Sequence, residues 1–390
     1  MPEQDARPLR QWQKEALAKW RAVGHRGIVS VVTGGGKTVF ALACVRNLAP
    51  ETTLVVVPTL ALLDQWWEES SCYLGIGVDE IFVMKNRSRL RTGTVNLAVM
   101  NTASKQDWSI DARTTGSLLL IVDECHKVAS EKFRTVLDVP HSASLGLSAT
   151  PDRPYDQLLD EVLIPALGEV IYTYTYRDAL RDEVIVPFVL KNVVFELEAE
   201  RQLEYDKLTK AIARSMQQHG PEADKTIALL LRRARVLNLS LNRVSLALKL
   251  VKMHLGKRVL VFHEDIEACN LIFQILHDNG VPAGVYHSKL NLRERVQMLT
   301  AYRSGTIQVL VTCRALDEGF NVPETQVGII AASTATRRQR IQRLGRVLRP
   351  SKGKEGAVVY TLVASAGEFG RLKAEEQEME GVASVEWSRA

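Results

Sequence analysis

Residues 28–38 read IVSVVTGGGKT, a short apolar run followed by three glycines and a Lys-Thr pair. The β-branched residues favour a buried strand, and the glycines allow a tight turn whose backbone N–H groups point inward. From Thr38 onward the apolar residues suit a helix, so the stretch predicts a strand, a loop and a helix N-terminus. Such a loop binds phosphate: Lys37 reaches the β- and γ-phosphates of a nucleotide, and the Thr38 hydroxyl ligates magnesium.

The phosphate-loop pattern is incomplete. The full pattern has glycine where this chain has Val31, so only its Gly-Lys-Thr end and a shorter Gly-x-Gly-Lys-Thr form are present. A glycine-rich turn with a surface lysine is the alternative interpretation. The preceding strand and the Lys-Thr pair favour a phosphate loop, whose backbone comprises Thr33, Gly34, Gly35 and Gly36.

Length and composition describe a globular protein of two domains. The chain has 390 residues, 46% hydrophobic and 24% charged, and a single core seldom grows beyond about 250–300 residues. No apolar run approaches the ~20 residues that a membrane span needs, and the N-terminus lacks a signal-peptide pattern. We therefore expect a cytoplasmic, nucleoid-associated or otherwise intracellular protein with no membrane partner.

The cysteines and the net charge exclude few classes of function. The five cysteines are scattered without the spacing of metal ligands, so we expect reduced, structural thiols. A net charge of +5 permits a polyanionic partner without requiring one.

Other predicted strands end in residues that carry chemistry. The run 117–122 delivers Asp123 and Glu124 to the carboxyl end of a strand, where α/β sheets bind ligands. There Asp123 can hold magnesium and Glu124 can activate a water. A charged turn is the alternative, but a phosphate loop requires an acidic partner for its metal. Three more strands, near 54–57, 95–100 and 145–149, lead to Pro58 and Thr59, to Thr102, and to Ser148 and Thr150.

A basic segment precedes the strand at 95–100. In Lys85-Asn86-Arg87-Ser88-Arg89-Leu90-Arg91 every second residue is basic. If extended, this segment presents one cationic face suited to phosphates, and if coil it is a solvated loop. The sequence leaves both interpretations open.

Taken in order, these features resemble the motifs of superfamily 2 helicases, in which two RecA-like domains sandwich ATP. The resemblance implies an α/β fold with parallel sheets and a helical insert at the start of the second domain. In the first domain, Arg10 and Gln13 resemble the upstream adenine-reading element, and Thr33 to Thr38 resembles motif I. The other first-domain matches are Pro58 and Thr59 with motif Ia, Thr102 with motif Ib, Asp123 to His126 with a DExH motif II, and Ser148 to Thr150 with motif III.

The second half resembles the partner domain. Residues 257–262 are similar to its opening strand. Residues 309–312 lead into residues 316–323, which are similar to motif V, and residues 342–350 match motif VI. Because residues i and i+3 share a helix face, Arg346 and Arg349 can point together at a phosphate bound by the other domain. The resemblance implies catalysis by Glu124, Gln342, Arg346 and Arg349, ATP contacts from Asp317 and Gly319, coupling by His126, Ser148 and Thr150, and nucleic-acid contacts from Pro58, Thr59, Thr102, Thr312 and Arg314.

The details look most like the XPB-like group, which includes phage UvsW and bacterial RadD-type proteins. Residues 58–66, 316–319 and 342–350 carry this likeness, whereas DEAD-box RNA helicases have Asp-Glu-Ala-Asp and His-Arg-x-Gly-Arg forms. Val31 and Cys125 depart from the usual pattern without removing a catalytic group. The chain begins almost at the first motif, so we expect it to lack the N-terminal damage-recognition domain of XPB.

We expect a first RecA-like domain at residues 1–185 and a second at 186–390, with the helical insert at about 196–255. The leucines of the insert favour packing onto the second sheet over direct DNA contact. The polar tail after Leu362 receives no role.

The resemblance implies an ATP- and Mg²⁺-dependent DNA helicase or translocase that moves 3′ to 5′ in repair, recombination or replication. Its partner would be single-stranded, branched or duplex DNA, with a nuclease or repair protein as a possible companion. The alternatives are an RNA-dependent ATPase or helicase, a nucleotide-switched clamp, and the motor of a restriction or remodelling assembly.

Overall fold

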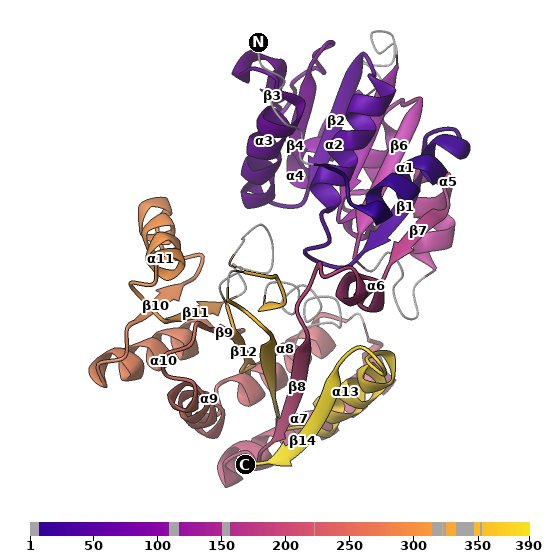
Figure 1. The fold of residues 1–390 in the computed structure, drawn as a ribbon. Coiled ribbons are helices and arrows are strands. Elements are labelled where there is room, and N and C mark those ends of the chain that lie inside the picture. Colours follow the sequence, from indigo (N-terminus) through magenta and orange to yellow (C-terminus); the bar gives the residue numbers. More distant parts are fainter. Residues whose placement is uncertain are drawn as a thin grey trace. The chain divides into compact units, whose positions relative to one another are not determined.

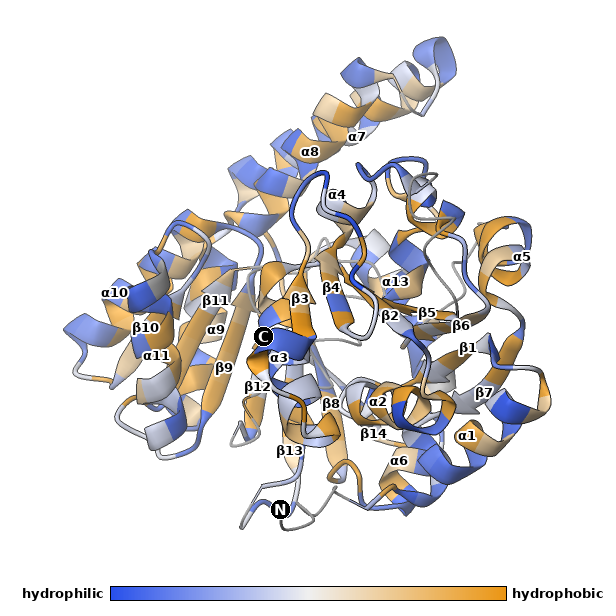
Figure 2. Ribbon diagram, turned by 90° about the horizontal axis from the view of Figure 1, so that it is seen from above, coloured by the Kyte–Doolittle hydropathy of each residue, from blue (hydrophilic) through white to orange (hydrophobic). Residues whose placement is uncertain are grey.

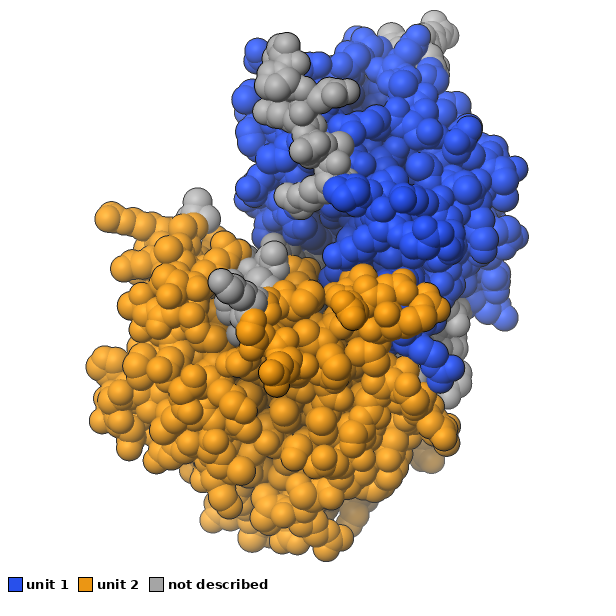
Figure 3. Space-filling model, viewed as in Figure 1, with its two compact units in different colours: residues 1–179 blue, residues 180–390 orange. Residues whose placement is uncertain are grey.

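The computed structural model describes residues 8–108, 117–149, 157–221, 223–313, 322, 325–332, 347–351 and 353–390. The chain forms two compact units, residues 1–179 and 180–390, coloured separately in Figure 3. Each unit contains a parallel sheet with helices, so the predicted α/β class with two parallel sheets is confirmed.

The first unit contains a seven-stranded parallel sheet in the order β3-β4-β2-β5-β6-β1-β7 (Figure 1). Its central strands are completely buried, as their continuous apolar sequences predicted. The strands are β1 (Arg26–Val31), β2 (Thr52–Val57), β3 (Ile81–Val83), β4 (Val95–Val99), β5 (Leu118–Asp123), β6 (Ala143–Ser148) and β7 (Val170–Tyr174).

The helices of this unit connect successive parallel strands. Parallel strands need such crossovers to bring the chain back across the sheet. The helices that follow β1 and β2 begin at the carboxyl ends of those strands, where the sequence predicted functional motifs. The helices are α1 (Gln11–Ala22), α2 (Lys37–Leu48), α3 (Leu60–Leu74), α4 (Met100–Ala103), α5 (Ile164–Leu167) and α6 (Tyr176–Arg181), with short 3₁₀ turns at Val78–Glu80, Cys125–Lys127 and Arg134–Asp138 and a π turn at Leu159–Leu163.

The second unit contains another seven-stranded parallel sheet, in the order β10-β11-β9-β12-β13-β8-β14. The strands are β8 (Phe188–Val194), β9 (Val259–His263), β10 (Ala283–Tyr286), β11 (Val309–Cys313), β12 (Val327–Ile330), β13 (Ala357–Val363) and β14 (Ser384–Arg389). Its helices are α7 (Ala199–His219), α8 (Asp224–Asn238), α9 (Leu241–Met253), α10 (Ile266–Asp278), α11 (Leu292–Ser304) and α13 (Ala366–Glu378).

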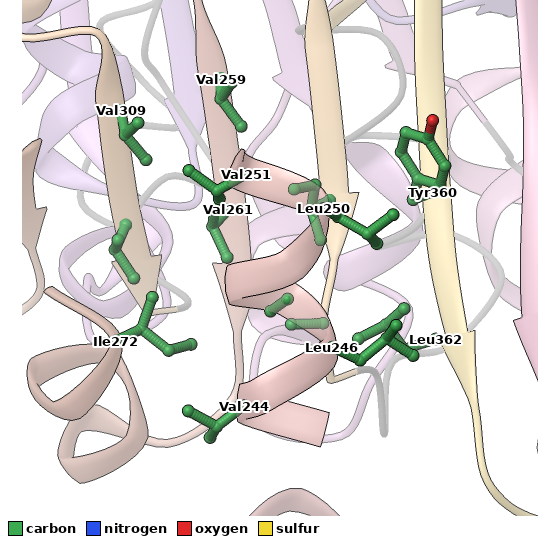
Figure 4. Close-up of a cluster of buried hydrophobic side chains, with 14 of the residues drawn as sticks. Val244, Leu246, Leu250, Val251, Val259, Val261, Ile272, Val309, Tyr360 and Leu362 are labelled. Atoms are coloured by element: carbon green, nitrogen blue, oxygen red, sulfur yellow. The ribbon is translucent and has the colours of Figure 1, made fainter. Parts of the chain in front are cut away.

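The helical segment between β8 and β9 divides into two parts. Helix α9 packs on the sheet, and Figure 4 shows Val244, Leu250 and Val251 beside Val259 and Val261. Helices α7 and α8 pack against each other along their length (Figure 2). They leave several apolar side chains exposed, including Leu203 (61%) and Leu231 (67%). The expected packing onto the sheet therefore describes α9 better than the other two helices.

The polar C-terminal tail is structured. Helix α13 begins with a capping box in which Ser365 and Glu368 hydrogen-bond each other's backbone N–H groups. Strand β14 then pairs in parallel with β8 along Ser384–Arg389, and the Trp387 indole contacts the Phe369 ring at 4.7 Å between centroids. Assigning the tail no role was wrong as regards the fold, because this segment supplies an edge strand of the second sheet.

Within the described ranges, none of the helices combines the length and the apolar character needed to cross a bilayer.

Candidate functional site

The loop between β1 and α2 can adopt its conformation only with glycine. Gly34 and Gly36 have φ angles of 87° and 99°, which other residues rarely adopt. A Cβ on Gly35 would lie 2.5 Å from Val31 Cγ1 and 3.0 Å from the Val32 carbonyl oxygen. Helix α2 begins at Lys37 with no side-chain cap, so the N–H groups of its first turn suit an anion.

Helix α1 holds this loop from the N-terminal side. Arg10 Nη1 donates to the Gly35 carbonyl at 2.9 Å, and Gln13 Nε2 donates to the Gly36 carbonyl at 2.9 Å. The Gln13 side chain is 2% exposed, and its Oε1 accepts from the Arg10 backbone N–H. Trp12 Nε1 also donates to the Gly35 carbonyl, at 3.2 Å, a contact that the sequence interpretation missed because a buried tryptophan reads as core.

Lys37 and the acidic residues after β5 form one electrostatic cluster. Lys37 Nζ lies 3.1 Å from Glu124 Oε1. Burial acts to raise the pKa of Glu124, but Lys37 and His126 outweigh it and lower that pKa to about 2. Burial together with the Glu124 charge raises the pKa of Asp123, although Lys37 opposes this. Burial acts to lower the pKa of Lys37, and the two carboxylates raise it overall. The cluster therefore keeps Glu124 ionised and Lys37 protonated.

Asp123 is oriented by two donors. Trp66 Nε1 donates to its Oδ2 at 2.9 Å, and the Glu124 backbone N–H donates to its Oδ1 at 2.9 Å. Trp66 is fully buried in α3, so it both packs in the core and positions a predicted magnesium ligand. A tryptophan on the apolar face of a helix usually indicates core packing, and only its place at the end of the 58–66 pattern could have indicated more.

Glu124 and His126 join the cluster to strand β6. Glu124 adopts a left-handed conformation with φ of 50°, which is uncommon for a residue other than glycine and is often found at functional sites. His126 Nδ1 lies 3.0 Å from Ser148 Oγ and 3.5 Å from Glu124 Oε2. His126 and Ser148 are both buried, so a continuous series of contacts joins Glu124 to the end of β6.

The first unit fits a magnesium-bound nucleoside triphosphate. The glycine loop and the uncapped start of α2 suit the phosphates, and the Asp123 carboxylate is the oxygen ligand that Mg²⁺ prefers. The Thr33 hydroxyl is buried and has no hydrogen-bond partner among the described residues, so it is available to a ligand. Thr38, at the second position of α2, is half-buried and would supply its hydroxyl to the metal.

Family comparisons cover most of both units. Residues 7–153 match the family described as type III restriction enzyme, res subunit, and residues 242–351 match the helicase conserved C-terminal domain. The chain is 28% identical over 381 residues to the DNA 3′-5′ translocase XPB2 of Sulfurisphaera tokodaii, covering 93% of this chain and 83% of the relative. It is also 28% identical to the DNA 3′-5′ helicase XPB of Kineococcus radiotolerans, covering 93% of this chain and 60% of the relative. These matches make the chain similar to the XPB-type helicases of superfamily 2.

Solved structures agree on the fold of this helicase. A type ISP restriction-modification enzyme, LlaBIII bound to DNA, superposes with a TM-score of 0.68 at 13% identity, over 99% of this chain and 31% of that one. Dbp5 of S. cerevisiae, bound to RNA and ADP BeF₃, gives a TM-score of 0.60 at 14% identity, over 97% of this chain and 89% of that one. The two parallel sheets are therefore RecA-like domains, as the motif order implied.

The predicted DNA-contacting residues of the first unit follow adjacent strands. Thr59 caps α3, its Oγ1 accepting from the Leu62 N–H at 3.4 Å, and Pro58 precedes it at the end of β2. Thr102 lies in α4, directly after β4, and is half-buried. Since β2 and β4 are neighbours in a parallel sheet, their carboxyl ends open at the same edge.

The second-unit residues are described only in part. Thr312 is 1% exposed within β11, and this burial gives no support to its predicted nucleic-acid contact, which stays a prediction. Arg349 is described, and burial lowers the pKa of its guanidinium. The other predicted residues, Thr150, Arg314, Asp317, Gly319, Gln342 and Arg346, lie outside the described residues.

Proposed function

We propose that the protein is an ATP-dependent DNA helicase or translocase that moves 3′ to 5′ and serves repair, recombination or replication. The observation that carries this proposal is the continuous contact series from Lys37 through Glu124 and His126 to Ser148. It joins a phosphate-binding lysine, a water-activating carboxylate and the end of a neighbouring strand. That arrangement suits a site in which ATP hydrolysis is coupled to movement along DNA.

The candidate-site residues of the first unit each have a role in the proposed reaction. Mg²⁺-ATP supplies the γ-phosphoryl group and the charge compensation for its transfer. Lys37 exchanges its contact with Glu124 for the phosphates, which releases the carboxylate. Glu124 would orient the attacking water, and Asp123, held by Trp66, would hold the metal. In the proposed cycle ATP draws the two units together through Gln342, Arg346 and Arg349 of motif VI, and hydrolysis releases them. Arg10 and Gln13, whose side chains here bond the loop carbonyls, would read the adenine.

The DNA contacts in this proposal lie at the carboxyl ends of β3, β4 and β2, which are consecutive in the sheet. Residues 85–91 follow β3 as a turn and coil rather than an extended strand. Side chains order this loop: Ser88 Oγ accepts from the Lys85 N–H at 2.9 Å, and Gln106 donates to the Lys85 carbonyl at 2.8 Å. Lys85, Arg87 and Arg89 are exposed, so the ordered loop presents its cations next to motif Ib.

A streptavidin-displacement assay on biotinylated single strands tests the direction of movement. We expect ATP-dependent release from the 5′ end and little release from the 3′ end. Hydrolysis without release from either end would favour a clamp, and release from RNA but not from DNA would favour the RNA-dependent alternative.

A second candidate is the motor of a restriction assembly, which the match of residues 7–153 to the restriction res-subunit family favours. Such a motor would show DNA-stimulated hydrolysis only after addition of a partner subunit. Stimulation of the isolated chain by DNA would count against it.

A further inference from the structure

A hollow lies at the carboxyl edge of the second sheet, where β13, β8 and β14 end side by side. It has a volume of about 900 Å³, and the first turns of α7 and α13 complete its walls. The carboxyl edge of a parallel sheet is where α/β folds bind ligands, and pockets of this size hold drug-sized molecules. This hollow, which we call the β14 pocket, is therefore large enough for a few side chains of a peptide.

The walls of the β14 pocket are mainly apolar and are already ordered. Phe369 of α13 is 41% exposed, and its ring centroid lies 4.7 Å from that of Trp387 in β14. The indole of Trp387 is fixed, because its Nε1 donates to Glu376 Oε2 at 3.1 Å and Lys373 Nζ lies 4.8 Å from its ring centroid. Phe195, Leu197 and Val363 are among the other lining residues. A preformed apolar surface needs little ordering on binding, so it favours a large apolar side chain as the anchor of a ligand.

The chain around the β14 pocket is acidic, although the protein as a whole is basic. The two lining segments, residues 194–202 and 363–389, contain nine acidic and four basic residues, against 36 acidic and 46 basic residues in the rest of the chain. Glu196 and Glu200 are exposed, and neither carboxylate forms an ion pair with a described residue. Among the described residues that line the pocket, Arg389 is the only cation. This charge balance repels a polyanion such as DNA and attracts a basic segment.

We propose that the β14 pocket binds a segment of a partner protein in which a large apolar or aromatic residue is flanked by lysines or arginines. The apolar residue packs against Phe369 and Trp387, and a flanking cation pairs with Glu196 or Glu200. The lining residues all belong to the second unit, and none of them is a predicted ATP or DNA contact. The pocket therefore adds a protein-binding site to the proposed ATPase and does not depend on that activity.

A random peptide library displayed on phage tests the proposal with the full chain as the target. Phe369→Ser, which removes the aromatic wall, serves as the counter-selection. We expect the enriched peptides to share an aromatic or large aliphatic residue flanked by lysine or arginine. No enrichment over Phe369→Ser, or enrichment of acidic peptides, would overturn the proposal.

Fluorescence anisotropy of the most enriched peptide, labelled with fluorescein, then measures its affinity. We expect Phe369→Ser to weaken binding at least about 10-fold, the scale of burying one large apolar side chain. The control Val296→Ser removes an apolar residue that is 55% exposed on α11, and it should match the wild type.

A second variant tests the charge of the site. Glu196→Lys combined with Glu200→Lys should weaken binding more at low salt than at high salt, because salt screens exposed charges. Both residues are exposed, so this double variant tests the pocket even if Phe369→Ser does not fold, and it then replaces Phe369→Ser in the counter-selection. Wild-type affinity in the double variant at low salt, or displacement of the peptide by single-stranded DNA, would overturn the proposal.

Discussion

Lys37 pairs with the Glu124 carboxylate at 3.1 Å, and in the proposed reaction it exchanges this partner for the phosphates of a nucleotide. Lys37→Ala should abolish ATP hydrolysis because it removes the cation that holds the β- and γ-phosphates. DNA should still bind, because backbone contacts spread over many residues remain. ATPase and DNA-binding titrations of Lys37→Ala separate the two functions, with the exposed Lys14 of α1 replaced by Ala as the control. Loss of folding or of all DNA binding in Lys37→Ala would contradict this assignment.

His263 makes the stability of the second unit sensitive to acid. It is 0% exposed, and burial, aided by the charge of Arg243, lowers its pKa to about 4. The unfolded chain takes up this proton near pH 6.5, so it binds more protons than the folded chain between about pH 6.5 and 4. Stability therefore falls as pH falls through this window, by about 2 kcal/mol from His263 at pH 5.

In the wild type the Asp265 N–H donates to His263 Nδ1 at 3.0 Å. The substitution His263→Asn keeps an acceptor for this hydrogen bond, but the asparagine side chain cannot titrate. Urea unfolding of both proteins at pH 7 and pH 5 measures the difference. We expect the variant to lose less stability on acidification. An identical pH dependence would show that folding leaves the pKa of His263 unchanged.

At the residue scale, the spacing of the sequence predicted which residues the structure brings together at the glycine loop and at the end of β5. Gly36, Lys37 and the Asp123-Glu124 pair were located because a phosphate loop and a strand end restrict which residues fit. Trp12 and Trp66 were missed as hydrogen-bond donors, because an indole buried in the core has the same sequence pattern whether or not its N–H has a functional partner. The structure distinguishes the two cases only through the atom that each N–H reaches.

At the element scale, substitutions in the loop after β3 test whether this loop contacts DNA. Replacing Lys85, Arg87, Arg89 and Arg91 with Ala should reduce the slope of log K against log salt by about 0.7–0.9 for each phosphate that the loop no longer neutralises. Arg91 lies over the Phe82 ring at 3.9 Å, so it should contribute less than the exposed cations. Lys14→Ala with Arg21→Ala on α1 is a control that also removes positive charge. A slope unchanged by the loop substitutions would identify a solvated loop.

Strands were easier to predict from the sequence where they contain an apolar run. Strands β2 and β5 are almost entirely apolar or β-branched, and β1 contains the shorter run Ile28–Val31 broken only by Ser30, so their sequences indicated buried parallel strands. Strand β14 was missed because Ser384–Arg389 alternates small, charged and aromatic residues without an apolar run. Pairing with β8 and the contact of Trp387 with α13 stabilise it, and such non-local pairing leaves little trace in the local sequence.

At the scale of the whole molecule, the proposed cycle predicts opposite failures for two variants. Arg346→Ala should slow hydrolysis, since an arginine finger is worth ~10³–10⁵ in rate, and should change nucleotide affinity only mildly. Glu124→Gln keeps the shape of the site but removes the group that activates water, so ATP-bound protein should accumulate. We expect the label-to-label distance between the two units, with ATP and DNA present, to shorten in Glu124→Gln and not in Arg346→Ala. Equal distances in the two variants would contradict the cross-domain role of motif VI.

In the proposed function, DNA stimulates ATP hydrolysis at the Lys37-Glu124 site. The most direct measurement compares ATPase rates of the wild type and Glu124→Gln with single-stranded DNA, duplex DNA, forked DNA, RNA and no nucleic acid. We predict that at least one form of DNA strongly stimulates the wild type, that RNA does so less, and that Glu124→Gln stays inactive throughout while still binding ATP. A wild-type ATPase rate that DNA does not change, or that only RNA raises, would contradict the proposed DNA dependence.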